Sequence, residues 1–176
     1  MNSIAPTAYI EHTHTDLGDN IRIGPGSTLG VEPLHIKVVD GNHRRGTSKG
    51  RLILGDHVDI GSLCVLSRGV EGNTIIHPHV FIGHLSSIGH DAEIGENTVI
   101  SAHVCVLGHV KIGKWCYIGP QTVIRNRKTI GDYSVIGEAS NVTKDIPSSV
   151  IAYGNPCRVI RENTWRPDSS VGHPLR

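Results

Sequence analysis

An aliphatic residue stands at every sixth position, without interruption, over the central part of this chain. The series is Ile76, Ile82, Ile88, Ile94, Ile100, Val106, Ile112, Ile118, Ile124, Ile130, Ile136 and Val142. An α-helix repeats its apolar face every 3.6 residues and a strand every 2, so a period of six fits neither. Hexapeptide repeats are typical of a parallel β-helix, in which short strands alternate with corners. The pattern therefore predicts an all-β solenoid.

Three hexapeptides would close one triangular coil, so residues eighteen apart should stack about 4.8 Å from one another. Ile76, Ile94 and Ile112 would then form part of one interior column. A glycine follows many of the aliphatic residues. We interpret it as a corner residue, needed either for a positive φ or for a close approach of backbones.

The repeat is irregular near the N-terminus, disappears between residues 31 and 53, and returns at Leu54. We predict a β-helix domain over residues 1–150 with an inserted loop at about 31–53, because a loop this long in a compact fold is usually functional or disordered. Residues 151–176 are predicted to form a C-terminal turn and tail. From Trp165 onward this tail should be loosely attached.

Composition excludes several classes of function. A net charge of +1 provides no basic surface for nucleic acid. No apolar run is long enough to span a membrane, and the N-terminus lacks a signal pattern. The four cysteines have no paired spacing. We therefore expect buried, reduced thiols in a cytoplasmic protein.

One vertical line of corner positions contains His90, Gly108, Asn126 and Lys144, each one coil from the last. Acyl transfer from a thioester needs a base, a donor for the tetrahedral oxyanion and a grip on the carrier. An imidazole suits the first role, and an unobstructed glycine N–H suits the second. Asn126, Lys144 and the neighbouring Arg127 could hold the amides and phosphates of a pantetheine chain. The alternative is that these residues have no catalytic role. Gly108 would then be a turn residue and the basic residues a solvated edge, because a corner histidine such as His90 is more often a turn residue than a base.

Resemblance to known families bears on this choice. Residues 88–95 (IGHDAEIG) resemble the segment that carries the catalytic histidine in the glucosamine N-acyltransferase of lipid A synthesis and in sugar O- and N-acetyltransferases. Residues 55–61 (GDHVDIG) and 66–69 (LSRG) look like corresponding coils of the lipid A enzyme. Residues 153–160 (YGNPCRVI) are similar to the closing motif of acetyl-CoA-dependent hexapeptide acetyltransferases.

The resemblance implies a left-handed parallel β-helix that works as a homotrimer, with sites between subunits. It makes His90 the general base and the N–H of Gly108 the oxyanion donor. Asp91 would orient His90 or be a plain corner acid. The implied reaction moves an acetyl group from acetyl-CoA to a hydroxyl or amino group of a sugar or nucleotide-sugar, and no metal is expected.

Many relatives hold the nucleotide-sugar partly with an additional N-terminal domain, for which we expect no room in this chain. Acceptor binding should then fall to the corners and to the insertion. The residues we predict for it are His43 and Arg44 in the insertion, Arg68, and a neighbour's His84.

Two rival functions are considered. The same fold class includes γ-type carbonic anhydrases, whose three zinc-binding histidines could correspond to His79, His84 and His43 here, although their positions in the repeat differ. A non-catalytic β-helix scaffold is the second. Trp115 and Tyr133, one coil apart, could cover an adenine or form a trimer contact.

Overall fold

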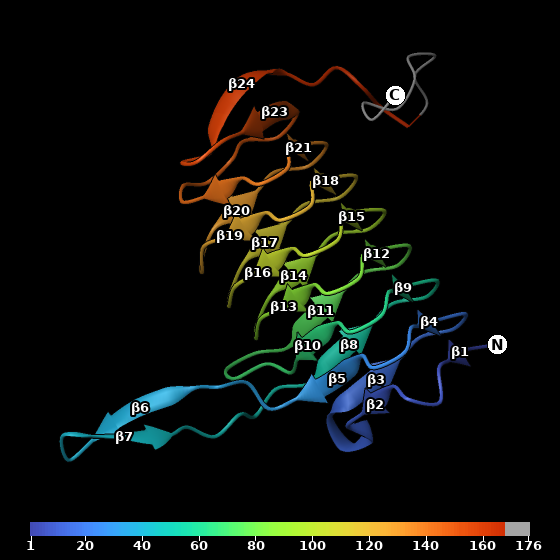
Figure 1. Cartoon of the computed structure of the whole chain (residues 1–176), viewed down its shortest axis with the longest axis vertical. Coiled ribbons are helices and arrows are strands. Elements are labelled where there is room, and N and C mark those ends of the chain that lie inside the picture. Colours follow the sequence, from blue (N-terminus) through green and yellow to red (C-terminus); the bar gives the residue numbers. More distant parts are fainter. Residues whose placement is uncertain (168–176) are drawn as a thin grey trace.

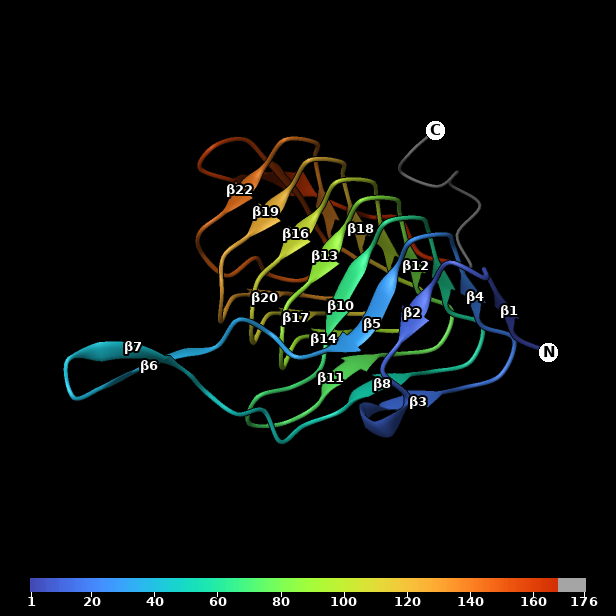
Figure 2. The same ribbon diagram turned by 60° about the horizontal axis from the view of Figure 1, so that its bottom comes forward.

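The computed structural model describes residues 1–167, and in it short strands coil into a three-sided prism (Figures 1 and 2). The first side is β1 (Ser3–Ile4), β4 (Arg22–Ile23), β9 (Asp59–Ile60), β12 (Phe81–Ile82), β15 (Val99–Ile100), β18 (Tyr117–Ile118), β21 (Val135–Ile136), β23 (Val150–Tyr153) and β24 (Arg158–Glu162). The second is β2 (Tyr9–Ile10), β5 (Thr28–Val31), β10 (Val65–Ser67), β13 (Ser87–Ile88), β16 (Cys105–Val106), β19 (Val123–Ile124) and β22 (Asn141–Val142). The third is β3 (Thr15–Leu17), β8 (Leu52–Leu54), β11 (Thr74–Ile76), β14 (Glu93–Ile94), β17 (Lys111–Ile112) and β20 (Thr129–Ile130). All neighbours within these sheets pair in parallel except β23 and β24, so the predicted all-β, left-handed parallel β-helix is confirmed.

The predicted interior columns are confirmed by the strand register. Ile76 pairs with Ile94, Ile94 with Ile112 and Ile112 with Ile130, each eighteen residues on. These side chains are at most 3% exposed. Burying an aliphatic side chain of this kind contributes about 1.5–3 kcal/mol relative to leaving it exposed, and the repeat does so in every coil.

In the regular coils, the glycine that follows the aliphatic residue serves close backbone approach rather than a positive φ. At Gly95, for example, an added Cβ would lie 2.5 Å from the carbonyl carbon of Gly113 in the next coil. The positive φ falls two residues later, on side chains such as Asn97, with φ of 57°. The second of the two explanations offered by the sequence therefore holds in the regular coils, while Gly30, with φ of 73°, follows the first.

Near the N-terminus a short 3₁₀ helix, η1 (His12–His14), accounts for the irregular start of the repeat. The predicted insertion at about 31–53 is present, and part of it has regular structure. This part is an antiparallel hairpin of β6 (Ile36–Val39) and β7 (Asn42–Arg45) that projects from the prism (Figures 1 and 2). Its turn residues Asp40 and Gly41 both have positive φ, as a two-residue hairpin turn requires.

The C-terminal segment runs back along the prism instead of hanging loosely. The indole of Trp165 lies 6.0 Å from that of Trp115, and the guanidinium of Arg166 lies 4.6 Å from the ring centre of Tyr133. The chain's own C-terminal segment thus contacts the two aromatic residues considered for an adenine or a trimer contact. The prediction of a loose tail is wrong for Trp165 and Arg166, and its remainder, residues 168–176, lies outside the described residues. The division of the chain at 150/151 stays a prediction, and β23 runs across it.

All four cysteines are free thiols, and Cys64, Cys116 and Cys157 are buried. Burial raises the pKa of Cys116 to about 12, so this thiol is unreactive at neutral pH. Over residues 1–167, no helix is long and apolar enough to cross a membrane.

Candidate active site

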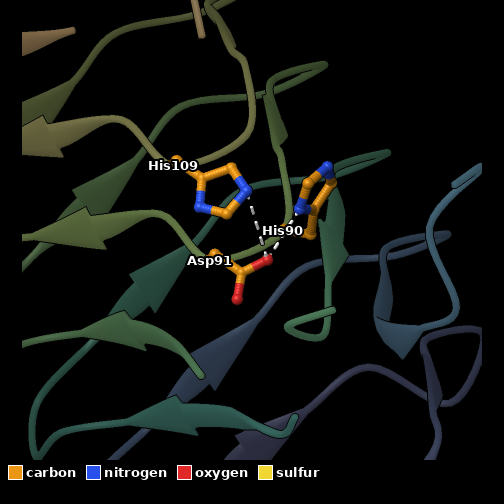
Figure 3. Close-up of side chains that lie close together, drawn as sticks. All are labelled: His90, Asp91 and His109. Carbon is orange, nitrogen blue, oxygen red and sulfur yellow. Dashed lines mark hydrogen bonds and ion pairs between the residues drawn. The ribbon is translucent and has the colours of Figure 1, made fainter. Parts of the chain in front are cut away.

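His90 and Asp91 lie at the corner between β13 and β14 and form a hydrogen-bonded pair (Figure 3). Nδ1 of His90 is 2.7 Å from Oδ2 of Asp91, whose side chain is only 6% exposed. An ionised carboxylate only accepts hydrogen bonds. An uncharged His90 therefore carries its proton on Nδ1 and leaves Nε2 with a free lone pair, which is the tautomer that a general base needs.

Asp91 is held by the extra residues that precede β11. Its carboxylate accepts hydrogen bonds from the backbone N–H groups of Val70, Glu71 and Gly72. Burial alone would raise the pKa of Asp91, but the hydrogen bonds from His90 and these three N–H groups outweigh it, so the pKa lies below its usual value. The carboxylate is thus kept ionised and fixed in orientation.

Gly108 lies against the face of the His90 ring, beside Nε2. A Cβ added to Gly108 would be 2.7 Å from Nε2 of His90 and 2.8 Å from Cε1. The N–H of Gly108 has no hydrogen-bond partner among residues 1–167. The predicted alignment of an imidazole and a bare amide one coil apart is therefore present in the fold.

Two histidines that the sequence reasoning did not single out share this site. Nε2 of His109 is 3.9 Å from Oδ2 of Asp91, and its ring meets that of His90 edge-on at 5.1 Å (Figure 3). The ring of His35, from the base of the β6–β7 hairpin, is 6.4 Å from His90. His109 could have been found, because it occupies the repeat position of Asp91 one coil further on.

Two cavities meet at His90 and Gly108. One, of about 190 Å³, is polar and is lined by His35, Val70, Glu71, His90, Gly108, His109, Asn126 and Arg127. The other, of about 270 Å³, has the largely apolar lining Pro33, Leu34, Val65, Ser67, Ser87, Ile88, Gly89, His90, Val106, Leu107 and Gly108. His90 and Gly108 thus lie between a polar cavity and a largely apolar one.

Only some of the residues predicted to bind the acyl donor lie beside His90. Asn126 and Arg127 line the polar cavity beside His90. Lys144 follows Asn126 by one coil, since β19 pairs in register with β22, but it is exposed and lies outside the lining of either cavity.

The residues predicted for the acceptor are scattered within one chain. His43 and Arg44 are exposed on β7, while Arg68 is mostly buried and lies 3.6 Å from Glu32. His84 is at the corner between β12 and β13 and lines a separate cavity of about 500 Å³. Within a single chain the fold therefore does not bring His84 to His90.

The histidines of the rival zinc site are also apart. His79 stacks on His57 with ring centres 4.8 Å apart, and His79, His84 and His43 form no group within reach of one ion in the described part of the chain. His90, Asp91 and His109 do offer atoms within 4.8 Å of one another. Asp91 already accepts four hydrogen bonds, however, so an ion there would have to displace the His90–Asp91 contact.

Comparison with known proteins supports this description. Residues 73–108 match the family described as bacterial transferase hexapeptide (six repeats). The UDP-3-O-acylglucosamine N-acyltransferase of Methylorubrum populi is 29% identical over 153 residues, which cover 87% of this chain and 43% of that protein. The galactoside O-acetyltransferase of Escherichia coli (strain K12) is 60% identical over 50 residues, 28% of this chain and 25% of that protein.

Among solved structures, UDP-N-acetylglucosamine O-acyltransferase from Moraxella catarrhalis superposes with a TM-score of 0.70 at 26% identity, covering 95% of this chain and 77% of that one. The chain spans less than half the length of the curated relatives it matches. The resemblance predicted from the sequence is confirmed: the chain is a hexapeptide-repeat β-helix and is similar to sugar acyltransferases.

Proposed function

We propose that this protein is an acyltransferase that moves an acyl group, acetyl in the simplest case, from acyl-CoA to a hydroxyl or amino group of a sugar or nucleotide-sugar. The observation that carries the proposal is the His90–Asp91 pair, which leaves Nε2 of His90 free beside Gly108, whose N–H has no hydrogen-bond partner among residues 1–167. The names of the relatives, an N-acyltransferase, an O-acetyltransferase and an O-acyltransferase, support the same class.

The step needs no covalent enzyme intermediate. Nε2 of His90 takes the proton from the acceptor as its oxygen or nitrogen attacks the thioester carbonyl. The oxyanion that forms accepts a hydrogen bond from the N–H of Gly108. When the intermediate collapses, the carbon–sulfur bond breaks, and the leaving thiolate takes the proton from the His90 imidazolium. His90 is thereby returned to its starting state.

We propose that the donor lies along the corner column beyond Gly108. The amide of Asn126 can pair with the amides of a pantetheine chain, and Arg127 with its phosphates. Lys144, one coil further on and exposed, would contribute charge to the phosphate end. Acetyl-CoA is the donor we propose first, and no metal ion takes part.

We further propose a homotrimer, because the three faces of the prism differ in charge. The third face carries charged residues such as Asp16, Glu93 and Lys111. The outward positions of the second face are uncharged, namely Tyr9, Thr28, Val65, Ser87, Cys105, Val123 and Asn141. On the first face they include the ion pair of Arg22 and Asp59 and continue with the uncharged residues Phe81, Val99, Tyr117, Val135 and Ile151. Packing the first face of one subunit on the second face of the next would bury both.

Such an arrangement lets a neighbour complete the acceptor site. His84 stands at the corner between the first and second faces, and in a trimer it would approach the neighbour's site. His43, Arg44 and Arg68 are the further acceptor contacts we propose. Three buried thiols are compatible with a reducing compartment, and we propose a cytoplasmic location.

The test is release of free CoA thiol from acetyl-CoA by the purified full chain, with a panel of sugars, amino-sugars and their nucleotide conjugates as acceptors. His90→Ala should lower turnover by about 10²-fold or more, with the oligomer and its melting temperature retained. His57→Ala, an exposed corner histidine of another column, is the control and should keep full activity. Equal turnover by wild type and His90→Ala would refute the mechanism. Activity that is lost on chelation would point to the zinc enzyme, and the absence of any transfer or CoA binding would point to the scaffold.

A further inference from the structure

His35 enters the site from a part of the chain that the repeat does not build. It lies just before β6, at the base of the hairpin, and lines the polar cavity together with His90. The two rings are 6.4 Å apart between centres and are tilted by 34°. None of the functions assigned above uses His35.

The backbone and the ring of His35 are both fixed. Its N–H donates to the carbonyl of Pro33 at 2.8 Å, and its carbonyl accepts from the N–H of Gly46 at 2.7 Å. The ring packs against Gly46, where an added Cβ would lie 2.6 Å from Nδ1 and 2.9 Å from Cε1. Gly46 therefore covers the ring at Nδ1, Cε1 and Cγ, and Nε2 is the ring nitrogen that lies away from this contact.

The surroundings of Nδ1 select the tautomer of His35. This atom is buried and has no hydrogen-bond partner in the part of the chain that the structure describes, residues 1–167. An uncharged imidazole donates from one ring nitrogen and accepts at the other. Because a buried N–H without an acceptor is strongly disfavoured, the proton belongs on Nε2. His35 thus presents a donor to the same cavity in which Nε2 of His90 presents an acceptor.

We propose that His35 positions the acceptor and selects a hydroxyl over an amino group, an inference that rests on the acyltransfer proposed above. A hydroxyl oxygen has two lone pairs, so it can attack with one, accept from His35 with the other, and give its proton to His90. An amine has a single lone pair, which the attack consumes. Two hydrogen bonds of about 2.8 Å each, to one shared oxygen, span up to roughly 5.6 Å between their nitrogen atoms. The ring centres of His35 and His90 are 6.4 Å apart, so one oxygen can be held between the two rings.

For an amine acceptor, the N–H of His35 would be left unpaired in a cavity closed by substrate. A donor left unpaired in this way corresponds to roughly 5- to 150-fold in rate. The wild-type protein should prefer a sugar over its amino-deoxy counterpart by a factor in this range, beyond the intrinsic difference between the two acceptors.

The experiment compares kcat/KM for the best hydroxyl acceptor of the panel with kcat/KM for the sugar that carries an amino group at the same carbon. His35→Ala should reduce the hydroxyl-to-amine ratio by about 5-fold or more, with KM for acetyl-CoA unchanged. His35→Gln, whose amide nitrogen can replace Nε2, should restore the ratio, and His35→Asn should not. Lys37→Ala, exposed on the same hairpin, is the control.

The outcomes separate this inference from the function on which it rests. An unchanged ratio in His35→Ala, a panel in which only amines are acylated, or an equal loss for both acceptors that His35→Gln fails to rescue would each overturn the role of His35 while leaving the acyltransfer intact. A wild-type protein that acylates no acceptor would remove both.

Discussion

Gly108→Ala adds one methyl group beside the reacting nitrogen of His90. The new Cβ would lie 2.7 Å from Nε2, 2.8 Å from Cε1 and 3.2 Å from Cδ2. Non-bonded atoms of this kind settle at about 3.5 Å, so the ring would have to retreat by roughly 0.8 Å. It cannot do so without stretching its 2.7 Å contact with Asp91. If it stays, the methyl group lies over the ring face at Nε2 and crowds the space beside this nitrogen.

Either response should lower kcat/KM by about 10²-fold, the typical effect of a misplacement near 1 Å in an active site. The fold should be unaffected, because the φ of Gly108 is not positive and Ala102 occupies the same position of the neighbouring corner. Alanine also keeps the N–H proposed for the oxyanion. The loss would therefore report on His90 rather than on the amide.

Ala102→Gly removes the same methyl group from that neighbouring corner and should leave turnover and melting temperature near the wild-type values. A double-mutant cycle gives the decisive comparison. In a His90→Ala background, Gly108→Ala should have little further effect, because the ring it obstructs is gone. Turnover of the single Gly108→Ala variant within about twofold of wild type would refute the argument that Gly108 is required by the His90 ring.

Three further outcomes follow from the site. Asp91→Asn can turn an amide N–H toward Nδ1 of His90 and reverse the tautomer, so turnover should fall by roughly 10²- to 10⁴-fold. The pKa of Asp91 is lowered on folding. Its ionised carboxylate therefore stabilises the fold fully at pH values above its pKa in the unfolded chain, about 3.9. This stabilisation is lost as the pH falls through the lower pKa of the folded protein. The difference in melting temperature between wild type and Asp91→Asn should thus shrink from about pH 6 to about pH 3. Arg127→Ala should raise KM for acetyl-CoA about 3- to 10-fold without changing KM for the acceptor.

The prism could be predicted because its rule is local. Each hexapeptide places one aliphatic residue inward, and register then follows from counting, as the column from Ile76 to Ile130 shows. The same counting along the sequence predicts Gly108 one coil from His90. Applied to the next position of the corner, it also predicts His109 one coil from Asp91.

The segments outside the period could not be placed by counting. The extra residues before β11 fold over the corner and direct three N–H groups at Asp91, a contact that depends on the path of a loop. The insertion contains a recognisable hairpin signal, Asp40-Gly41 between β-branched and polar runs, whereas the loss of the hexapeptide period by itself predicts only a loop. Nothing in the sequence indicates that the base of this hairpin brings His35 to His90.

His84 and His90 show why the corner of His90, and not another, is suited to chemistry. Both follow an aliphatic residue by two positions in consecutive repeats. Nδ1 of His84 accepts a hydrogen bond from the N–H of Ser62, so the proton of an uncharged His84 belongs on Nε2, where it blocks the lone pair a base would use. Nδ1 of His90 instead faces the carboxylate of Asp91, where the repeat of His84 has Leu85. A single acidic residue at the next corner position therefore reverses the tautomer, and identical placement on the scaffold yields a donor in one repeat and a base in the other.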